Sequence, residues 1–171
     1  MKKKLVELVN DGLSFAYGYL LYEDLKNIFI NSLDDQGRFD GYILISKDLV
    51  DYGQGSDFLK KLKTYNEFWQ ASSIGKSSSD VFKNKPDYRN LINYAKDNKK
   101  IISLGKSLDY YDLIRGFVKD FDGNIVTIEA LDINSGQVYD DFEIHISDIK
   151  FLEVESIDNI LLKYVNSKNK L

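Results

Sequence analysis

The chain has 171 residues, with 23 Lys and Arg against 27 Asp and Glu, and its formal net charge is -4. It contains no Cys and one His, which excludes disulfide scaffolds, thiolate zinc sites, cysteine nucleophiles and histidine clusters. With 43% hydrophobic and 13% aromatic residues the chain can bury a core. Its excess of acidic residues argues against nucleic-acid binding as its main function, because binding to a phosphate backbone depends on Lys and Arg.

The first residues resemble the basic region of a secretory signal peptide, because three lysines follow Met1. Glu7, Asn10 and Asp11 interrupt the apolar run that such a signal requires. No stretch reaches the roughly 18 uninterrupted apolar residues of a membrane span. We therefore expect a cytoplasmic protein with no membrane partner.

The first part of the chain has short segments of strand type at residues 4–9, 15–22, 27–33 and 39–46. The apolar period then changes from two to about 3.6, with Ser56 placed as a helix N-cap. The predicted helical stripe consists of Phe58, Leu59, Leu62, Tyr65, Phe68 and Trp69. We expect this stripe to pack on a small β-barrel.

A Ser-rich composition over residues 71–83 indicates a linker. Pro86, the single proline, is predicted to open a short helix that leads into the next strand. Strand-type segments follow at residues 100–104, 113–119, 124–131 and 142–149. A second helical stripe, with Ser156 as its N-cap, consists of Ile157, Ile160, Leu161, Tyr164 and Val165.

The two ends of the chain match each other in order, which indicates an internal repeat. The pairs include Gly18 with Gly116, Asp24 with Asp122, Gly37 with Gly136, Ser56 with Ser156, Leu62 with Leu162, and Asn66 with Asn166. Any two β-rich segments share some glycines, but here the differences in length all fall at expected turns.

We therefore predict a mainly β (α+β) fold with two small, strongly bent antiparallel barrels in tandem, each followed by an amphipathic helix. The first barrel and its helix occupy residues 1–70. The linker and short helix occupy residues 71–98. The second barrel and its helix occupy residues 99–171.

The sequence contains only weak signals for a catalytic or metal-binding site. The acids Asp132, Asp140, Asp141 and Glu143 match no calcium loop and are interpreted as a solvated turn. His145 is interpreted as a partly buried structural residue. We predict no catalytic, cofactor-binding or metal-binding residues and no enzymatic activity, with an enzyme using carboxylates alone kept as a third possibility.

Residues 115–129 resemble the first motif of Sm/Hfq-like proteins, in which a Gly and a hydrophobic strand lead to a Phe-Asp turn and an Asn. Gly116, Phe121, Asp122 and Asn124 carry the resemblance. The turn is shorter than the family's, and the second Sm motif has no match after Asp148. The resemblance implies a strongly bent five-stranded barrel preceded by a helix.

The leading hypothesis is a non-enzymatic bacterial or phage protein-binding module of adaptor, regulatory or immunity type, with a protein partner and a possible homo-oligomer. The alternative, implied by the Sm-like resemblance, is binding of single-stranded RNA. Its contacts would come from Arg115, Lys119, Phe121 and Asn124.

Overall fold

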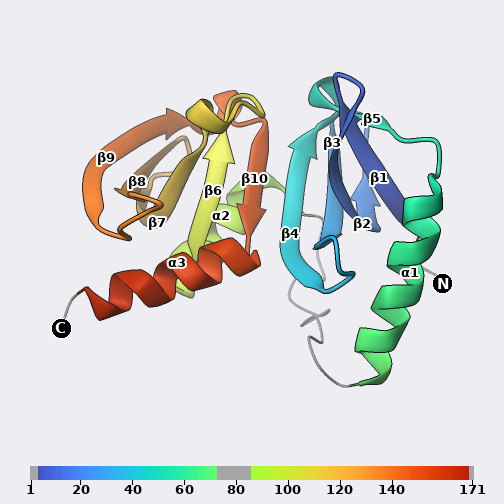
Figure 1. The fold of residues 1–171 in the computed structure, drawn as a ribbon. Helices are drawn as coiled ribbons and strands as arrows, with labels where there is room; N and C mark the ends of the chain where they lie inside the picture. Colours follow the sequence, from blue (N-terminus) through green and yellow to red (C-terminus); the bar gives the residue numbers. More distant parts are fainter. Residues whose placement is uncertain (1–3, 73–85, 170–171) are drawn as a thin grey trace. The chain divides into compact units, whose positions relative to one another are not determined.

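The computed structural model describes residues 4–72 and 86–169, and the chain divides into two compact units, residues 1–85 and 86–171. Each unit holds one curved antiparallel sheet of five strands with helices packed on it (Figure 1). The predicted mainly β class with helical additions is confirmed. Within the described residues, no helix is long and apolar enough to cross a membrane.

The first unit contains five strands and one long helix. Its strands are β1 (Leu5–Asn10), β2 (Leu13–Glu23), β3 (Asn27–Leu33), β4 (Phe39–Ser46) and β5 (Asp51–Tyr52), in the order β5-β1-β2-β3-β4. A 3-10 turn, η1 (Lys47–Leu49), precedes β5, and helix α1 (Asp57–Ala71) follows it and packs on β1. The core is formed by Leu8, Ile28, Phe29, Ile30, Tyr42, Leu44, Ile45 and Leu62.

The second unit repeats this arrangement with one more helix. Its strands are β6 (Ile101–Gly105), β7 (Ile114–Phe121), β8 (Ile125–Leu131), β9 (Val138–His145) and β10 (Phe151–Val154), in the order β10-β6-β7-β8-β9. The 3-10 turns η2 (Tyr110–Asp112) and η3 (Ile146–Asp148) precede β7 and β10, and the helices are α2 (Tyr88–Asp97) and α3 (Ile157–Lys168). Helix α2 packs on β6, β7 and β10, and α3 contacts β6.

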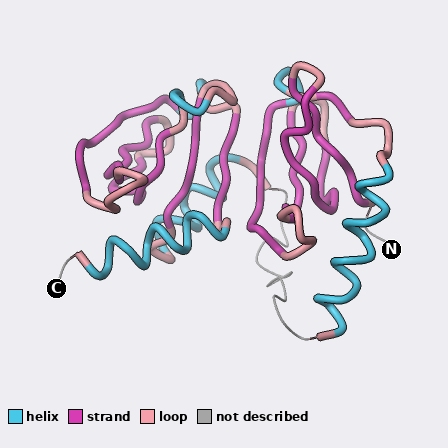
Figure 2. Tube along the Cα trace, in the orientation of Figure 1, coloured by secondary structure: helices cyan, strands magenta, loops and turns pink. Residues whose placement is uncertain are grey.

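The tube in Figure 2 makes the common order of strands, 3-10 turn, strand and helix easy to follow in each unit. Both sheets are open, because no ladder within the described residues joins β4 to β5 or β9 to β10. The closed barrels expected from the sequence are therefore not observed.

Glycine is required at the two repeated positions inside the strands because the neighbouring strand approaches too closely for a side chain. Gly18 and Gly116 occupy the same register, since Gly18 pairs with Val6 and Ser32, and Gly116 pairs with Ile102 and Ala130. A Cβ at Gly116 would lie 2.1 Å from the carbonyl oxygen of Glu129, so a larger residue would force the two strands apart. The register of the two sheets thus supports the predicted repeat.

Two elements depart furthest from the expected positions, while other strand ends differ by one or two residues. The predicted strand over residues 142–149 instead spans Val138–His145 and ends at η3, because exposed Asp140 and Asp141 continue the ladder opposite Ala130 and Glu129. Helix α2, expected inside the linker, belongs to the second unit, where Leu91, Ile92 and Ala95 are fully buried. The Ser-rich stretch lies largely outside the described residues.

Candidate protein-interaction surface

Helix α3 begins where the sequence predicts it, because the Ser156 side chain accepts a hydrogen bond from the backbone N–H of Asn159 at 3.3 Å. Its buried side is formed by Asn159, Leu162 and Asn166. Leu162 packs with Ile101, Leu131 and Phe117 in a hydrophobic cluster. The helix is therefore anchored by one leucine and two asparagines.

The two asparagines are buried because each satisfies a partner in the sheet or its turns. The Asn166 Nδ2 donates to the carbonyl oxygen of Gly136 at 2.9 Å, and the Ser103 hydroxyl donates to the Asn159 Oδ1 at 3.1 Å. A hydrogen-bonded polar side chain can occupy a buried helix face at little cost. Asn159 meets this condition only at its Oδ1, because its Nδ2 is buried without a hydrogen-bond partner among the described residues. This pattern turns the apolar residues of α3 outward.

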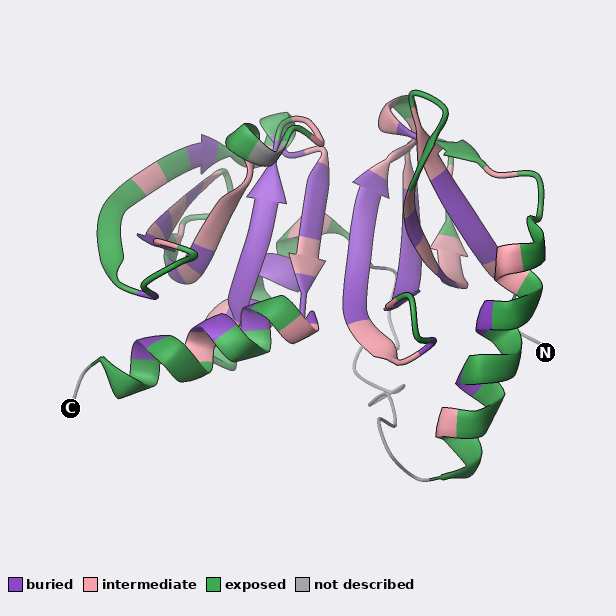
Figure 3. Ribbon diagram, viewed as in Figure 1, coloured by how far each residue is buried: buried purple, intermediate pink, exposed green. Residues whose placement is uncertain are grey.

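The predicted orientation of α3 is therefore wrong. Four of the five residues expected to face the sheet lie on the outer face, namely Ile160, Leu161, Tyr164 and Val165, with exposed fractions of 55%, 56%, 60% and 40%. Figure 3 shows this helix as largely exposed, with short buried patches on one side. We call these four side chains the α3 outer face.

A groove of about 370 Å³ borders the α3 outer face. It is lined by the apolar residues Leu161, Leu162, Val165 and Ile133 and by the charged residues Arg115 and Asp158. Ile133 is itself 43% exposed. The site thus combines an apolar ridge, a neighbouring hollow and one charge of each sign. Large exposed apolar patches rimmed by polar groups are typical of protein-binding surfaces.

The first unit shows that the fold does not require this apolar face. At the matching positions on α1 the chain has Lys60, Lys61 and Thr64, where α3 has Ile160, Leu161 and Tyr164. The anchors are nevertheless the same, because Leu62 and Asn66 are the buried residues of α1, and Asn66 donates to the Gly37 carbonyl at 2.9 Å. Three of the four residues of the α3 outer face are therefore replaced by polar residues on α1, while Val165 matches Tyr65, which is likewise 40% exposed.

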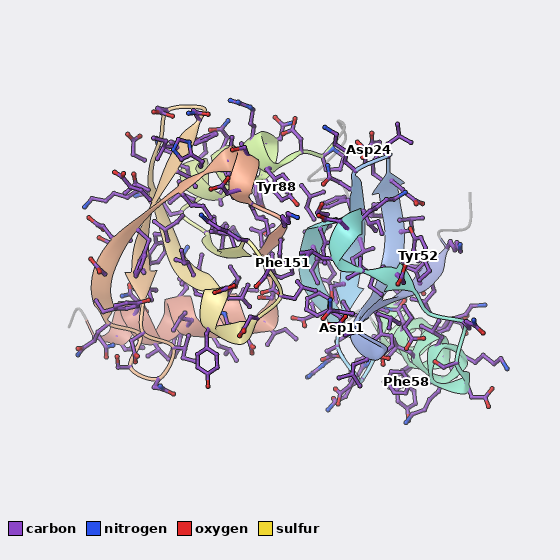
Figure 4. The ribbon with its side chains drawn as sticks, turned by 90° about the horizontal axis from the view of Figure 1, so that it is seen from above. Asp11, Asp24, Tyr52, Phe58, Tyr88 and Phe151 are labelled. Atoms are coloured by element: carbon purple, nitrogen blue, oxygen red, sulfur yellow. The ribbon has the colours of Figure 1, made fainter. Side chains whose placement is uncertain are left out.

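The first stripe is also only partly buried. Phe68 and Tyr65 are 62% and 40% exposed, while Phe58 and Leu59 are half-buried. Trp69 is half-buried and donates its indole N–H to the carbonyl oxygen of Gln36 at 2.8 Å. In Figure 4, Phe58 is labelled on α1, and its ring lies 4.9 Å from that of Tyr17.

The four residues expected to contact RNA do not form one site. Arg115 pairs with Ser103 at the start of β7, whereas Phe121 pairs with Val126 at the other end of that strand, about 20 Å away at a rise of about 3.3 Å per residue. Lys119 forms an ion pair with Asp141. Arg115 lines the groove beside α3 instead.

The turn that carries Asn124 has an ordinary structural explanation. The Asp122 carboxylate accepts backbone N–H bonds from Asn124 and Ile125, each at 2.7 Å, and these bonds lower the pKa of Asp122. Asp24 accepts the equivalent bonds in the first unit, from Lys26 and Asn27, each at 2.8 Å. The Asn124 side chain lies 3.5 Å from the Nδ1 of His145, which is exposed rather than partly buried as expected.

The acidic residues near the β8–β9 turn do not gather into a cation site. Among the described residues, no group of three or more His, Cys, Asp or Glu side chains is placed to hold a metal ion. The Asp132 carboxylate accepts backbone N–H bonds from Asn134 and Ser135 and organises the turn instead. Of the acids interpreted as a solvated turn, only Asp132 lies in the turn, because Asp140, Asp141 and Glu143 are exposed residues of strand β9.

No protein-family model, curated protein or solved structure matches the chain. Sequence reasoning missed the α3 outer face because it assigned the apolar residues of that helix to the core. The matched asparagines were the available signal, since repeated polar residues at the same helical position indicate a shared buried contact.

Proposed function

We propose that the protein is a non-enzymatic binding module that recognises a protein partner through the α3 outer face and the groove beside it. The observation that carries this proposal is the exposure of Ile160, Leu161 and Tyr164 on a helix whose counterpart has Lys60, Lys61 and Thr64. Exposing apolar side chains that the fold does not need favours association, because burying them in an interface removes them from water.

The chemistry expected of the partner follows from the same surface. An apolar side chain would fill the groove between Leu161, Val165 and Ile133, while polar groups would meet Arg115 and Asp158 at its edges. Tyr164 offers a large contact area with few rotatable bonds, which keeps the entropic cost of binding low. An adaptor, regulatory or immunity-type role fits these properties.

We also propose that each unit is an Sm-like module derived by tandem duplication. The proposal is supported by the repeated strand order, by Gly18 and Gly116 at matching close approaches, and by the helix α2 that precedes the second sheet. Single-stranded RNA binding, the alternative function, has less support, because Arg115, Lys119, Phe121 and Asn124 are spread along β7 and the turn after it.

The experiment exchanges the α3 outer face for the residues of α1, as Ile160→Lys, Leu161→Lys and Tyr164→Thr in one variant, which we call the α3 triple variant. Partners are captured from the source cell with wild-type and variant protein, with and without nuclease, and quantified by mass spectrometry. We expect a stoichiometric protein that survives nuclease and is lost with the variant. Far-ultraviolet circular dichroism should show unchanged folding, since α1 tolerates these residues.

Three results bear on the alternatives. If wild-type protein forms dimers by light scattering and the α3 triple variant is monomeric, the partner is a second copy of the chain. If only RNA is captured, and Phe121→Ala but not the α3 triple variant abolishes it, the RNA alternative replaces the proposal. If the variant retains every partner of the wild type, the α3 outer face is not the binding surface.

A further inference from the structure

The opposite flank of α3 borders a second cavity, of about 420 Å³, which lies between α2, α3 and the sheet of the second unit. Its walls are mostly apolar and include Ala95, Phe117 and Val118. Four lysines also line it, namely Lys96, Lys99, Lys119 and Lys163, against one acid, Glu129. We call this space the lysine cavity.

The four lysines differ in their partners. Lys96 pairs with Asp120 at 2.8 Å, and Lys119 pairs with Asp141. Lys163 donates to the backbone carbonyl oxygen of Lys99 at 2.5 Å, and within the described residues no carboxylate forms an ion pair with the ammonium of Lys163 or of Lys99. Lys99 and Lys163 are therefore the two cations still able to take an anion.

The charges around Lys163 also favour the binding of an anion. Burial lowers the pKa of Lys163, and the neighbouring charges of Lys100 and Lys99 lower it further. The Glu155 carboxylate, which precedes helix α3, already forms an ion pair with the Lys100 ammonium at 2.9 Å and accepts a hydrogen bond from the Tyr94 hydroxyl at 2.6 Å. An anion beside Lys163 would relieve the repulsion among these ammonium groups.

In the first unit, the residues that correspond to the lining of the lysine cavity are different. Tyr19 takes the place of Phe117, with Asn31 opposite it where Phe117 has Glu129. The Tyr19 hydroxyl donates to the Asn66 Oδ1 at 3.1 Å, and burial together with the charge of Glu67 raises the pKa of Tyr19. Phe117 has no hydroxyl to make the matching bond to Asn166, and Ser167 replaces Glu67.

We propose that the lysine cavity binds an organic anion that has an apolar body and a single negatively charged head group. The body packs on Phe117 and Val118, and the head group meets the ammoniums of Lys99 and Lys163. Lysine ammoniums act as point charges, so a carboxylate, sulfonate or phosphate head group satisfies the same chemistry. Glu129 disfavours a second negative charge at the other side of the cavity.

The test uses the full-length protein and the fluorescent aromatic anion 8-anilinonaphthalene-1-sulfonate. We expect saturable binding with one site per chain. Lys163→Glu should weaken binding by about tenfold or more, because it places a carboxylate beside the head group. The matched control is Lys63→Glu on α1, which should leave binding unchanged.

A second variant gives the lysine cavity the residues of the first unit, where the Glu67 carboxylate lies 3.9 Å from the ammonium of Lys63, the counterpart of Lys163. Phe117→Tyr combined with Ser167→Glu installs the residues of the first unit, where the same arrangement is part of the native structure. We expect this double variant to lose dye binding while its circular dichroism stays that of the wild type. Retained dye binding in this variant would contradict the proposal.

Competition identifies which part of the ligand matters. Decanoate should displace the dye, while decanol and inorganic phosphate at equal concentration should not. Displacement by phosphate alone would overturn the need for an apolar body, and displacement by decanol would overturn the need for a charge. Dye binding that is lost in the α3 triple variant but retained in Lys163→Glu would place the dye on the α3 outer face and refute the proposal.

Discussion

Tyr52 shows how one side chain can tie distant parts of a unit together. It lies on β5, one of the labelled residues in Figure 4, and its hydroxyl forms a hydrogen bond with the Glu23 carboxylate of β2. Glu23 also pairs with Lys47 at 2.5 Å, and the Lys4 ammonium lies 5.3 Å from the centre of the Tyr52 ring. The short strand β5 is thereby fixed against the sheet.

This environment gives the first prediction. Burial, followed by the hydrogen bond and charge of Glu23, raises the pKa of Tyr52 to about 12 from 10.0. The folded chain therefore keeps this proton at pH values where the unfolded chain has lost it. The resulting contribution to stability is complete below pH 10 and is lost as pH rises through about 12.

The measurement is the alkaline absorbance titration of tyrosinate, taken as the difference between wild type and Tyr52→Phe. We expect a midpoint near 12 for this residue. Glu23→Gln should move the midpoint of Tyr52 downward, since it removes the negative charge beside the hydroxyl. A difference titration centred at 10 in the wild type would contradict the assigned contact.

At the scale of elements, each unit joins its long helix to a hairpin turn by the same pair of residues. Gly37 and Gly136 adopt positive φ angles of 77° and 67°, and their carbonyl oxygens accept hydrogen bonds from Asn66 and Asn166. A Cβ at Gly136 would lie 2.8 Å from the Val165 side chain. Helix and turn are therefore in direct contact, with no room for a larger residue.

The second prediction concerns these asparagines. Asn166→Ala should lower the free energy of unfolding by about 1–3 kcal/mol, because it leaves the buried Gly136 carbonyl without its donor. Asn66→Ala should cost more, since it also removes the acceptor of the Tyr19 hydroxyl. Denaturant unfolding followed by circular dichroism measures both.

The matched control is Asn169→Ala at the end of α3. Asn169 donates to the Ser135 carbonyl at 2.6 Å, but it is exposed, so water can replace the lost bond. Its effect should stay within about 0.5 kcal/mol. Equal effects of Asn166→Ala and Asn169→Ala would show that burial of the Asn166 contact does not stabilise the unit.

At the scale of the whole molecule, the two units repeat one topology but differ in surface. Each has its own ladders, its own buried residues and its own helix anchored by a leucine and an asparagine. The α3 outer face and the lysine cavity both belong to the second unit. If the units arose by the proposed duplication, the two copies have kept the same strand order and helix anchors and have diverged in their surface residues.

The third prediction follows from this division. A fragment of residues 86–171 should fold alone, because it contains a complete five-stranded order and both helices that cover it. Dispersed amide resonances and a cooperative denaturant transition would be the expected result. A fragment that stays unfolded until residues 1–85 are added would show that the two units are not independent.

The sequence by itself determined the local elements and the repeat. Turn residues such as Asp24 and Asp122, the caps Ser56 and Ser156, and the glycines inside strands act through neighbours close in the chain or through backbone geometry, so their spacing is readable without a structure. The resemblance to Sm-like proteins remains a prediction, since none of the comparisons bears on it.

Only the tertiary structure decided which side of α3 is buried and where the strands β9 and β10 lie. Hydrophobic periodicity indicated the helix but assumed that its apolar residues face the sheet, whereas the hydrogen bonds of Asn159 and Asn166 hold the opposite side inward. Those partners, Ser103 and Gly136, lie 56 and 30 residues away in the chain. A contact between residues so far apart is satisfied only when the whole unit folds, and for that reason the candidate binding surface could not be inferred from the helix alone.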